Sequence, residues 1–431
     1  MNNSTVIEPA RELQVAGSAD VIVCGGGPAG IAAALNAARN GVSTMLIESA
    51  GCLGGIWSTG LLSWLIDCSN KSGFIKEIQA DMIERGVAQD FAETCGTISC
   101  DPEFMKCLME KKCLDAGVDI LLHTRVCSAV VKDDNITHVV TESKSGRQAY
   151  AGKIFIDCTG DGDLGALAGC GFDFGSPNGG LTQPMSLIAM LTGIDMDEVA
   201  QFVAHGPNPG LAPYQLLCAE LERAGVHPSY TRSTLFKVYD NLFTYMGNHQ
   251  YKVSALNVRD ITRATLEARA ELNRHIDGLR SLGGPWESIR LAATSASIGV
   301  REGRRLHGLY TVTLDDLLAG KSHPDGICKV RFGVDIHSLD PSYGKGLSSE
   351  NRKHKVQPYD IPLRALISRD RPNMMMAGRC ISGDFHAHAS YRVIGDAVPC
   401  GEAAGKYAAE AVKSKQLPAV IADSLLNNAS S

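Results

Sequence analysis

Residues 20–48 read DVIVCGGGPAGIAAALNAARNGVSTMLIE, and this stretch decides the fold. Asp20–Cys24 is a short apolar run rich in β-branched residues, which predicts a strand. The Ala-rich stretch Pro28–Asn40 predicts a helix that stops at Gly41, and Ser43–Glu48 predicts the next strand. Two strands joined by a helix form a βαβ unit, and such units build parallel sheets covered by helices. The sequence therefore predicts an α/β fold.

The glycines between the first strand and the helix have the spacing of a dinucleotide-binding fingerprint. Gly25 allows a tight turn, Gly27 lets a pyrophosphate approach the backbone, and Gly30 lets the helix pack closely on the strand. The helix that begins here offers free N–H groups and a positive dipole end to the phosphates. Glu48, at the end of the second strand, is placed to accept hydrogen bonds from the ribose hydroxyls. The nucleotide-binding residues predicted from this segment are Gly25, Gly27, Pro28, Ala29, Gly30 and Glu48.

Composition and charge narrow the function classes. The 431 residues carry a net charge of -6 and no long Lys/Arg run, so we expect no nucleic-acid partner. No uncharged apolar run approaches the ~20 residues that cross a bilayer, so we expect no membrane span. The first 19 residues lack a continuous apolar stretch, which argues against a secretory signal and favours a cytoplasmic enzyme. The 14 cysteines include no Cys-x-x-Cys pair, and the sequence predicts no metal site.

Several further motifs resemble the FAD-dependent oxidoreductases of the glutathione-reductase-like superfamily. A strand in these proteins ends in Thr-Gly beneath the FAD, and residues 154–163 (IFIDCTGDGD) look like that strand. The other motifs that carry the resemblance are residues 51–60 (GCLGGIWSTG), 301–316 (REGRRLHGLYTVTLDD), 334–337 (VDIH), 361–366 (IPLRAL) and 377–405 (AGRCISGDFHAHASYRVIGDAVPCGEAAG).

The resemblance implies FAD as the cofactor and a two-part architecture. A Rossmann-like FAD-binding domain of three layers with a parallel sheet is expected from residues 1–171 and 346–431. An inserted substrate domain of mixed α+β structure is expected from residues 172–345. No second dinucleotide-binding domain for NAD(P)H is predicted.

The resemblance also implies which residues contact the FAD. Small residues along the isoalloxazine ring permit close backbone approach, and the helix that begins near Gly395 is expected to point its N-terminus at the flavin. Asp384 and Asp396 are both candidates for the ribityl hydroxyls. The FAD contacts implied in this way are Gly54, Gly55, Val126, Gly160, Asp161, Gly378, Arg379, Asp384, Gly395 and Asp396.

The catalytic candidates lie in residues 383–392, GDFHAHASYR. Members of the family tend to carry a His and an Arg here, which His388 and Arg392 match best, and the extra His386 is the alternative base. The histidine would take or return a proton, and Arg392 would bind an anionic or oxygen-rich substrate. Arg301, Arg304 and Arg305 are interpreted as a charged helix face in preference to the lining of a cleft.

We therefore expect an enzyme that transfers a hydride between a small organic substrate and flavin N5. A flavin monooxygenase is the alternative enzyme, and a non-catalytic flavin-binding redox or electron-transfer module is the alternative from another class. The substrate, the electron donor or acceptor, covalent or non-covalent FAD and the oligomeric state, a homo-oligomer included, are left open.

Overall fold

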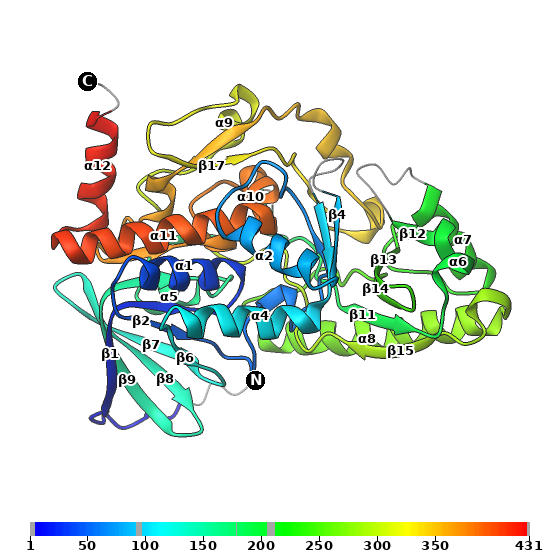
Figure 1. Cartoon of the computed structure of the whole chain (residues 1–431), viewed down its shortest axis with the longest axis horizontal. Coiled ribbons are helices and arrows are strands. Elements are labelled where there is room, and N and C mark those ends of the chain that lie inside the picture. The colour runs from blue at the N-terminus through cyan, green and yellow to red at the C-terminus, as the bar shows by residue number, and fades with distance from the viewer. Residues whose placement is uncertain (1–4, 92–96, 178, 205–211, 429–431) are drawn as a thin grey trace.

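The computed structural model describes residues 5–91, 97–177, 179–204 and 212–428. The predicted βαβ unit forms at the centre of the main sheet, as strand β1 (Val15–Cys24), helix α1 (Pro28–Arg39) and strand β2 (Thr44–Ile47) (Figure 1). β1 and β2 pair in parallel. Val21–Cys24 is wholly buried, which explains why this part of β1 is a continuous apolar run rather than an alternating one.

The main sheet has seven strands in the order β6-β2-β1-β9-β8-β7, with β19 added beside β9. The strands not yet given are β6 (Asp119–Leu121), β7 (Arg125–Lys132), β8 (Asn135–Ser143), β9 (Gly146–Asp157) and β19 (Met374–Met376). The first half of β9 pairs antiparallel with β8, and its last residues pair in parallel with β19. The α/β prediction is confirmed. The sheet is mixed rather than wholly parallel because tight turns join β7 to β8 and β8 to β9, and such turns require antiparallel neighbours.

Helix α11 (Ile394–Ser414) lies beside α1 on one face of the main sheet (Figure 1). The approach is very close, because a Cβ at Gly401 would lie 2.1 Å from the carbonyl oxygen of Ala29. A Cβ at Gly405 would lie 2.1 Å from the carbonyl oxygen of Ala33. The small residues of α11 therefore have a packing role that is independent of any cofactor.

A second hydrophobic core is built from residues between Met185 and Ile298. Its sheet has the order β12-β13-β14-β11-β15. Helix α8 (Val258–Ser281) covers this sheet and buries Ala264, Ala268, Leu272 and Ile276, which recur every four residues. The other elements here are β11 (Ile188–Thr192), α6 (Met196–Val199), β12 (Val203–Ala204), α7 (Ala212–Arg223), β13 (Thr234–Tyr239), β14 (Leu242–Met246) and β15 (Arg290–Thr294).

The segment that follows the second core returns to the first, where Leu306, Val312 and Ile336 are buried. The domain boundaries at residues 171 and 346 stay a prediction. In the part of the chain that the structure describes, no helix is both long and apolar enough to cross a membrane. The remaining helices and strands are β3 (Trp64–Leu65), α2 (Phe74–Glu84), β4 (Ala88–Phe91), β5 (Thr97–Cys100), α4 (Pro102–Asp115), α5 (Asp163–Leu167), β10 (Phe172–Asp173), β16 (Arg305–Leu306), α9 (Leu314–Ala319), β17 (Gly326–Val330), β18 (Tyr359–Pro362), α10 (Phe385–Tyr391) and α12 (Pro418–Asn428).

Candidate functional site

The glycine loop after β1 has the geometry of a phosphate cradle. Gly25 has φ +103°, and a Cβ there would lie 2.3 Å from the carbonyl oxygen of Cys158. A Cβ at Gly30 would lie 1.8 Å from the carbonyl oxygen of Gly25. By contrast, no described residue other than the two chain neighbours has an atom within 4 Å of a Cβ built at Gly27, where α1 begins without a side-chain cap. Two glycines are thus fixed by packing, and the third leaves the helix N-terminus open to an anion.

Glu48 lies beside this loop. Its carboxylate accepts hydrogen bonds from the backbone N–H of Gly26 and of Ala50, each at 2.6 Å. The N–H of Thr124 donates to the carbonyl oxygen of Glu48, which places the start of β7, with Val126, next to the same strand end. The predicted ribose and adenine contacts therefore lie together.

The Gly54-Gly55 loop joins the glycine loop to the second core. The N–H of Gly54 donates to the carbonyl oxygen of Gly26 at 2.8 Å. A Cβ at Gly55 would lie 2.9 Å from the Cα of Gly27. A few residues on, the carbonyl oxygen of Thr59 accepts a hydrogen bond from the N–H of Ser297. This loop therefore runs from the phosphate cradle to the edge of the second sheet.

The Thr-Gly turn after β9 meets the Gly378-Arg379 segment. Gly160 has φ +82°, and a Cβ there would lie 2.5 Å from the guanidinium of Arg379. That guanidinium forms an ion pair with Asp161 at 2.9 Å. A Cβ at Gly378 would lie 3.2 Å from the Cβ of Ala29, in the first turn of α1. The four residues predicted from these two distant motifs thus come together near the helix N-terminus.

Asp384 and Asp396 both have protein partners. Asp384 caps α10 by accepting from the N–H of Ala387, and its other oxygen accepts from the N–H of Leu314. Asp396 is fully buried and forms an ion pair with Lys71 at 2.9 Å. Burial raises the pKa of Asp396 well above its usual value, against the effect of Lys71. The choice between the two carboxylates for the ribityl chain stays a prediction.

Gly395, in the first turn of α11, is closely surrounded by backbone atoms. Its N–H donates to the carbonyl oxygen of Ile66, and a Cβ there would lie 2.1 Å from the carbonyl oxygen of Asp67. A larger residue at this position would therefore disturb the packing of α11, whatever the helix N-terminus does for the cofactor.

Helix α10 separates the two candidate histidines. His388 is fully buried; the backbone of Arg379 lies near its ring, but neither ring nitrogen makes a hydrogen bond of ordinary geometry to a described residue. Burial, together with the charges of Arg305 and Arg392, holds the pKa of His388 well below its usual value, so the imidazole is neutral at pH 7. Nε2 of His386 instead donates to the carboxylate of Glu350 at 3.0 Å, on another side of the helix.

Arg392 belongs to a buried polar network that the sequence did not reveal. Its guanidinium bonds the carboxylate of Asp335 at 3.0 Å and the backbone carbonyl of the same residue at 2.8 Å. Asp335 is 3.3 Å from Nε2 of His337, whose Nδ1 lies 3.1 Å from Nε2 of His249. The VDIH motif marked two of these residues, but no signal around His249 indicated that it would join them.

The charge states of this network follow from burial and from its two arginines. Burial and the charge of Arg301 lower the pKa of His337 to about 4, and the pKa of His249 falls well below its usual value for similar reasons. Burial works against the ionised form of Asp335, but His337, Arg392 and Arg301 outweigh it and lower the pKa of that carboxyl. Burial and Arg392 lower the pKa of Arg301 to about 10. At pH 7 both histidines are therefore neutral, Asp335 is anionic and both arginines are cationic.

Arg301 has only uncharged partners of its own. Its guanidinium donates to the carbonyl oxygen of Pro184 at 2.6 Å and to the hydroxyl of Ser186 at 2.9 Å. The interpretation of residues 301–305 as a charged helix face is wrong, because Arg301 lies in a loop and Arg305 begins strand β16. Their side chains point inward because the loop crosses the junction of the two cores.

Several buried polar atoms at this junction lack protein partners. Gln183 links His337 to Arg392, because its side-chain oxygen accepts hydrogen bonds from the N–H of His337 and from the guanidinium of Arg392. Within the described residues, no hydrogen bond reaches Nε2 of Gln183, Nε of Arg304, Arg305 or Arg392, or either ring nitrogen of His388. Buried donors of this kind require acceptors. Together with the open Gly27 and the carboxylate of Glu48, they fit a bound dinucleotide and an oxygen-rich substrate.

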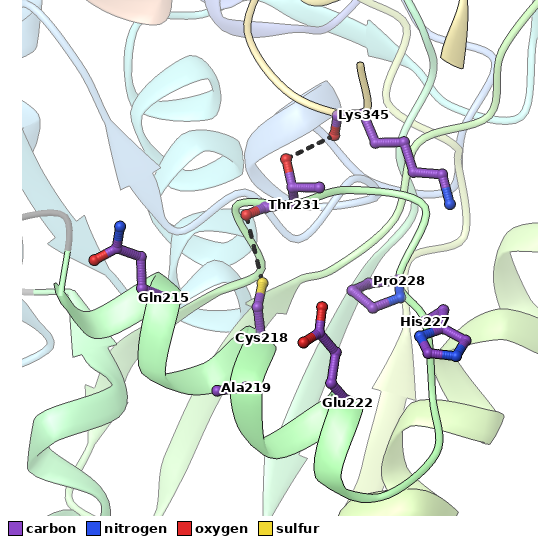
Figure 2. A pocket seen from close by; sticks show the side chains of 8 residues that line it. All are labelled: Gln215, Cys218, Ala219, Glu222, His227, Pro228, Thr231 and Lys345. Atoms are coloured by element: carbon purple, nitrogen blue, oxygen red, sulfur yellow. Dashed lines mark hydrogen bonds between the residues drawn. The ribbon is translucent and has the colours of Figure 1, made fainter. Parts of the chain in front are cut away.

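A separate depression of about 430 Å³ lies between α7 and the Lys345 segment (Figure 2). Lys345 supplies a backbone carbonyl to Thr231, and Cys218 donates to the carbonyl oxygen of Thr231 at 3.4 Å. The lining shares no residue with the groups predicted to bind the cofactor. We do not assign the reaction to it.

Comparison with known proteins identifies the family of this chain. A sequence profile of the family described as FAD dependent oxidoreductase matches residues 20–428. Thiamine thiazole synthase from Methanococcus vannielii is 30% identical over 155 residues, which cover 33% of this chain and 56% of that protein. The chain thus matches only about half the length of this curated relative.

Two solved structures share the fold. The p-nitrophenol 4-monooxygenase PnpA from Pseudomonas putida DLL-E4 aligns with a TM-score of 0.50 at 12% identity, over 94% of this chain and 83% of that chain. A triple mutant of the flavin-dependent brominase Bmp2 aligns with a TM-score of 0.51 at 10% identity, over 92% of this chain and 80% of that chain. The resemblance drawn from the sequence motifs is confirmed by the family match, which spans almost the whole chain. The chain belongs to the FAD dependent oxidoreductase family, and its cofactor is FAD.

Proposed function

We propose that this FAD-dependent oxidoreductase transfers a hydride between a small anionic organic substrate and FAD, with Arg301 and Arg392 holding the anionic group. The observation that carries the proposal is the charge balance at the junction of the two cores. Asp335 is the carboxylate bonded to Arg392, whereas Arg301 donates to the uncharged groups Pro184 and Ser186. Arg301 and Arg392 thus share the single carboxylate of Asp335, and an anionic substrate would balance the second positive charge.

The cofactor would lie along the residues that the fold brings together between α1 and the second core. The glycine loop and the N-terminus of α1 would bind the diphosphate, and Glu48 would bind the ribose. Bound FAD supplies the hydride chemistry, which no side chain provides. The residues proposed to hold it are Gly25, Gly27, Pro28, Ala29, Gly30, Glu48, Gly54, Gly55, Val126, Gly160, Asp161, Gly378, Arg379 and the N-terminus of α11 at Gly395, with Asp384 or Asp396 at the ribityl chain.

His388 is the proposed proton carrier. Neither of its ring nitrogens makes a hydrogen bond of ordinary geometry to a described residue, and it precedes Arg392 by one helical turn. Burial and the surrounding arginines lower its pKa and keep it neutral, so protonation becomes favourable only when negative charge enters the site. His386 is bonded to Glu350 on another side of α10, which makes it the weaker candidate.

The test is anaerobic mixing of the oxidised enzyme with a panel of small hydroxy and saturated carboxylates, which can donate a hydride, each paired with its neutral amide. Loss of the oxidised flavin absorbance with a carboxylate, and not with its amide, is the expected result. Equal reduction by both members of a pair would refute the role of the arginines. If no compound reduces the flavin but the reduced enzyme consumes dioxygen and hydroxylates a substrate, the enzyme is a monooxygenase. If neither reaction occurs, the electron-transfer module is favoured.

A further inference from the structure

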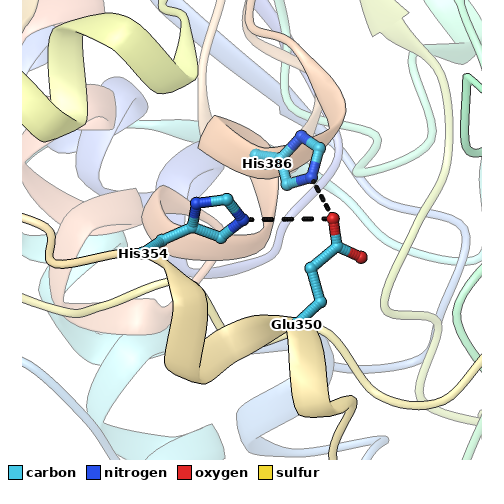
Figure 3. Close-up of side chains that lie close together, drawn as sticks. All are labelled: Glu350, His354 and His386. Carbon is cyan, nitrogen blue, oxygen red and sulfur yellow. Dashed lines mark hydrogen bonds and ion pairs between the residues drawn. The ribbon is translucent and has the colours of Figure 1, made fainter.

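Three side chains from two separate segments meet next to α10 (Figure 3). Glu350 lies in the short 3-10 helix η5 (Ser349–Lys353), and His354 directly follows that helix. His386 lies in α10. Nε2 of His386 is 3.0 Å from Oε1 of Glu350, and Nε2 of His354 is 3.9 Å from the same oxygen. One ligand atom from each of the three lies within 4.8 Å of the other two.

A pair of hydrogen-bonded side chains accounts for only part of this arrangement. The contact between His386 and Glu350 is an ordinary hydrogen bond. It leaves His354 unexplained, because Nε2 of His354 is shielded from solvent and has no hydrogen-bond partner in the described part of the chain. That nitrogen nevertheless points toward Oε1 of Glu350, and the two imidazole rings lie 5.3 Å apart between centroids. A buried imidazole nitrogen that points toward a carboxylate but is too far away to bond it indicates that an ion binds between the two groups.

A divalent transition-metal ion has the ligand preference that suits a site between these three side chains. Two imidazole nitrogens and one carboxylate oxygen are a common ligand set for Zn²⁺, with bonds of about 2.0–2.2 Å. Ligands that share such an ion lie roughly 3–4 Å apart, so a small rotation of the His354 ring would complete the set. The side chain of Glu350 is 42% exposed, which leaves solvent access for a water ligand in the fourth position. The donor set does not favour Mg²⁺ or Ca²⁺, which prefer oxygen ligands.

We propose that Glu350, His354 and His386 form a binding site for a divalent transition-metal ion of the Zn²⁺ type. No sequence motif indicates this site, because Glu350 and His354 are far from His386 along the chain. The site joins η5 to α10. Asn351, within η5, makes two hydrogen bonds to the backbone of Ile336, the residue between Asp335 and His337. The metal therefore has a structural role, because it would fix the segment that carries two residues of the buried network relative to Arg392.

The experiment uses the full chain loaded with FAD, stripped of metal with a chelator and titrated calorimetrically with Zn²⁺. One Zn²⁺ per chain is expected, with a rise in the melting temperature. Loss of an outer partner of a metal ligand costs about 10- to 100-fold in affinity, so His354→Ala should cost at least ~100-fold. Glu350→Gln, at a more exposed position, should do the same and serves as the second variant if the first folds poorly.

His307→Ala is the matched control, because His307 lies 3.5 Å from Asp173 and so forms a His–carboxylate pair of its own. This variant should bind Zn²⁺ as the parent protein does. Absence of stoichiometric Zn²⁺ binding, or an affinity that neither His354→Ala nor Glu350→Gln lowers, would overturn the proposal. The readout is metal binding itself, so the outcome is independent of the reaction that the enzyme catalyses.

Discussion

Replacing the two arginines of the site one at a time should have unequal effects on stability and similar effects on substrate binding. Arg301→Met removes a cation with uncharged partners, whereas Arg392→Met leaves Asp335 buried with its main counter-ion gone. Met keeps most of the apolar stem of Arg, so packing changes little. The comparison therefore isolates the charge of each guanidinium.

The magnitudes follow from the surroundings of each arginine. The pKa of Arg301 falls from 12.5 to about 10, which corresponds to ~3 kcal/mol against its charged form. Its two hydrogen bonds contribute roughly 1–3 kcal/mol in the other direction. Arg301→Met should thus change the free energy of unfolding by no more than ~2 kcal/mol. Arg392→Met should lower it by at most about 3–5 kcal/mol, the cost of breaking a fully buried ion pair from one side, because the side chain of Asp335 is 24% exposed.

Loss of either arginine should weaken the interaction with an anionic substrate. A hydrogen bond to a charged group is worth ~1.5–3 kcal/mol, or about 10- to 150-fold in kcat/KM. Urea unfolding of the FAD-loaded variants measures the stabilities, and anaerobic flavin reduction by the best carboxylate of the panel measures the substrate effect. If Arg301→Met is as unstable as Arg392→Met, Arg301 has a structural role that its visible contacts do not explain. If Arg301→Met reduces flavin at the parental rate, it does not bind substrate.

Three further predictions test the cofactor site, the proton carrier and the buried network. Gly27→Val should fold but lose FAD, because a Cβ there has open space in the apoprotein, whereas Gly30→Ala should fail to fold because its Cβ would meet a carbonyl at 1.8 Å; flavin content and circular dichroism distinguish them. His388→Ala should retain FAD and slow flavin reduction by ~100- to 10,000-fold, and His386→Ala should slow it less; the reverse order would exchange their roles. The pKa of His337 is about 4 in the folded chain and ~6.5 in the unfolded chain, so its contribution to stability is complete above pH ~6.5 and is lost as pH falls toward 4; urea unfolding at stepped pH should show this loss. His337→Gln should make the loss smaller and leave the part contributed by His249 and His388, whose pKa values are also lowered.

The sequence by itself determined the parts of this protein that depend on neighbours in the chain. An apolar run, a glycine loop and an Ala-rich stretch form β1 and α1 because strand and helix formation follow from local periodicity. The position of Glu48 beside the glycine loop could be predicted for the same reason, because a second strand parallel to the first brings its end to that loop. The match of motifs over most of the chain then indicated the family and FAD.

Only the tertiary structure decided which side chains face one another. Asp335, His249 and Arg301 lie far apart in sequence, and they meet Arg392 because the second core folds back onto the first. His386 and His388 lie close together in the sequence, so their positions along the chain do not show which one enters the site. Two residues apart on a helix, however, they project about 200° from each other. One therefore enters the arginine-lined junction and the other reaches Glu350, a separation that depends on how α10 is rotated against its neighbours.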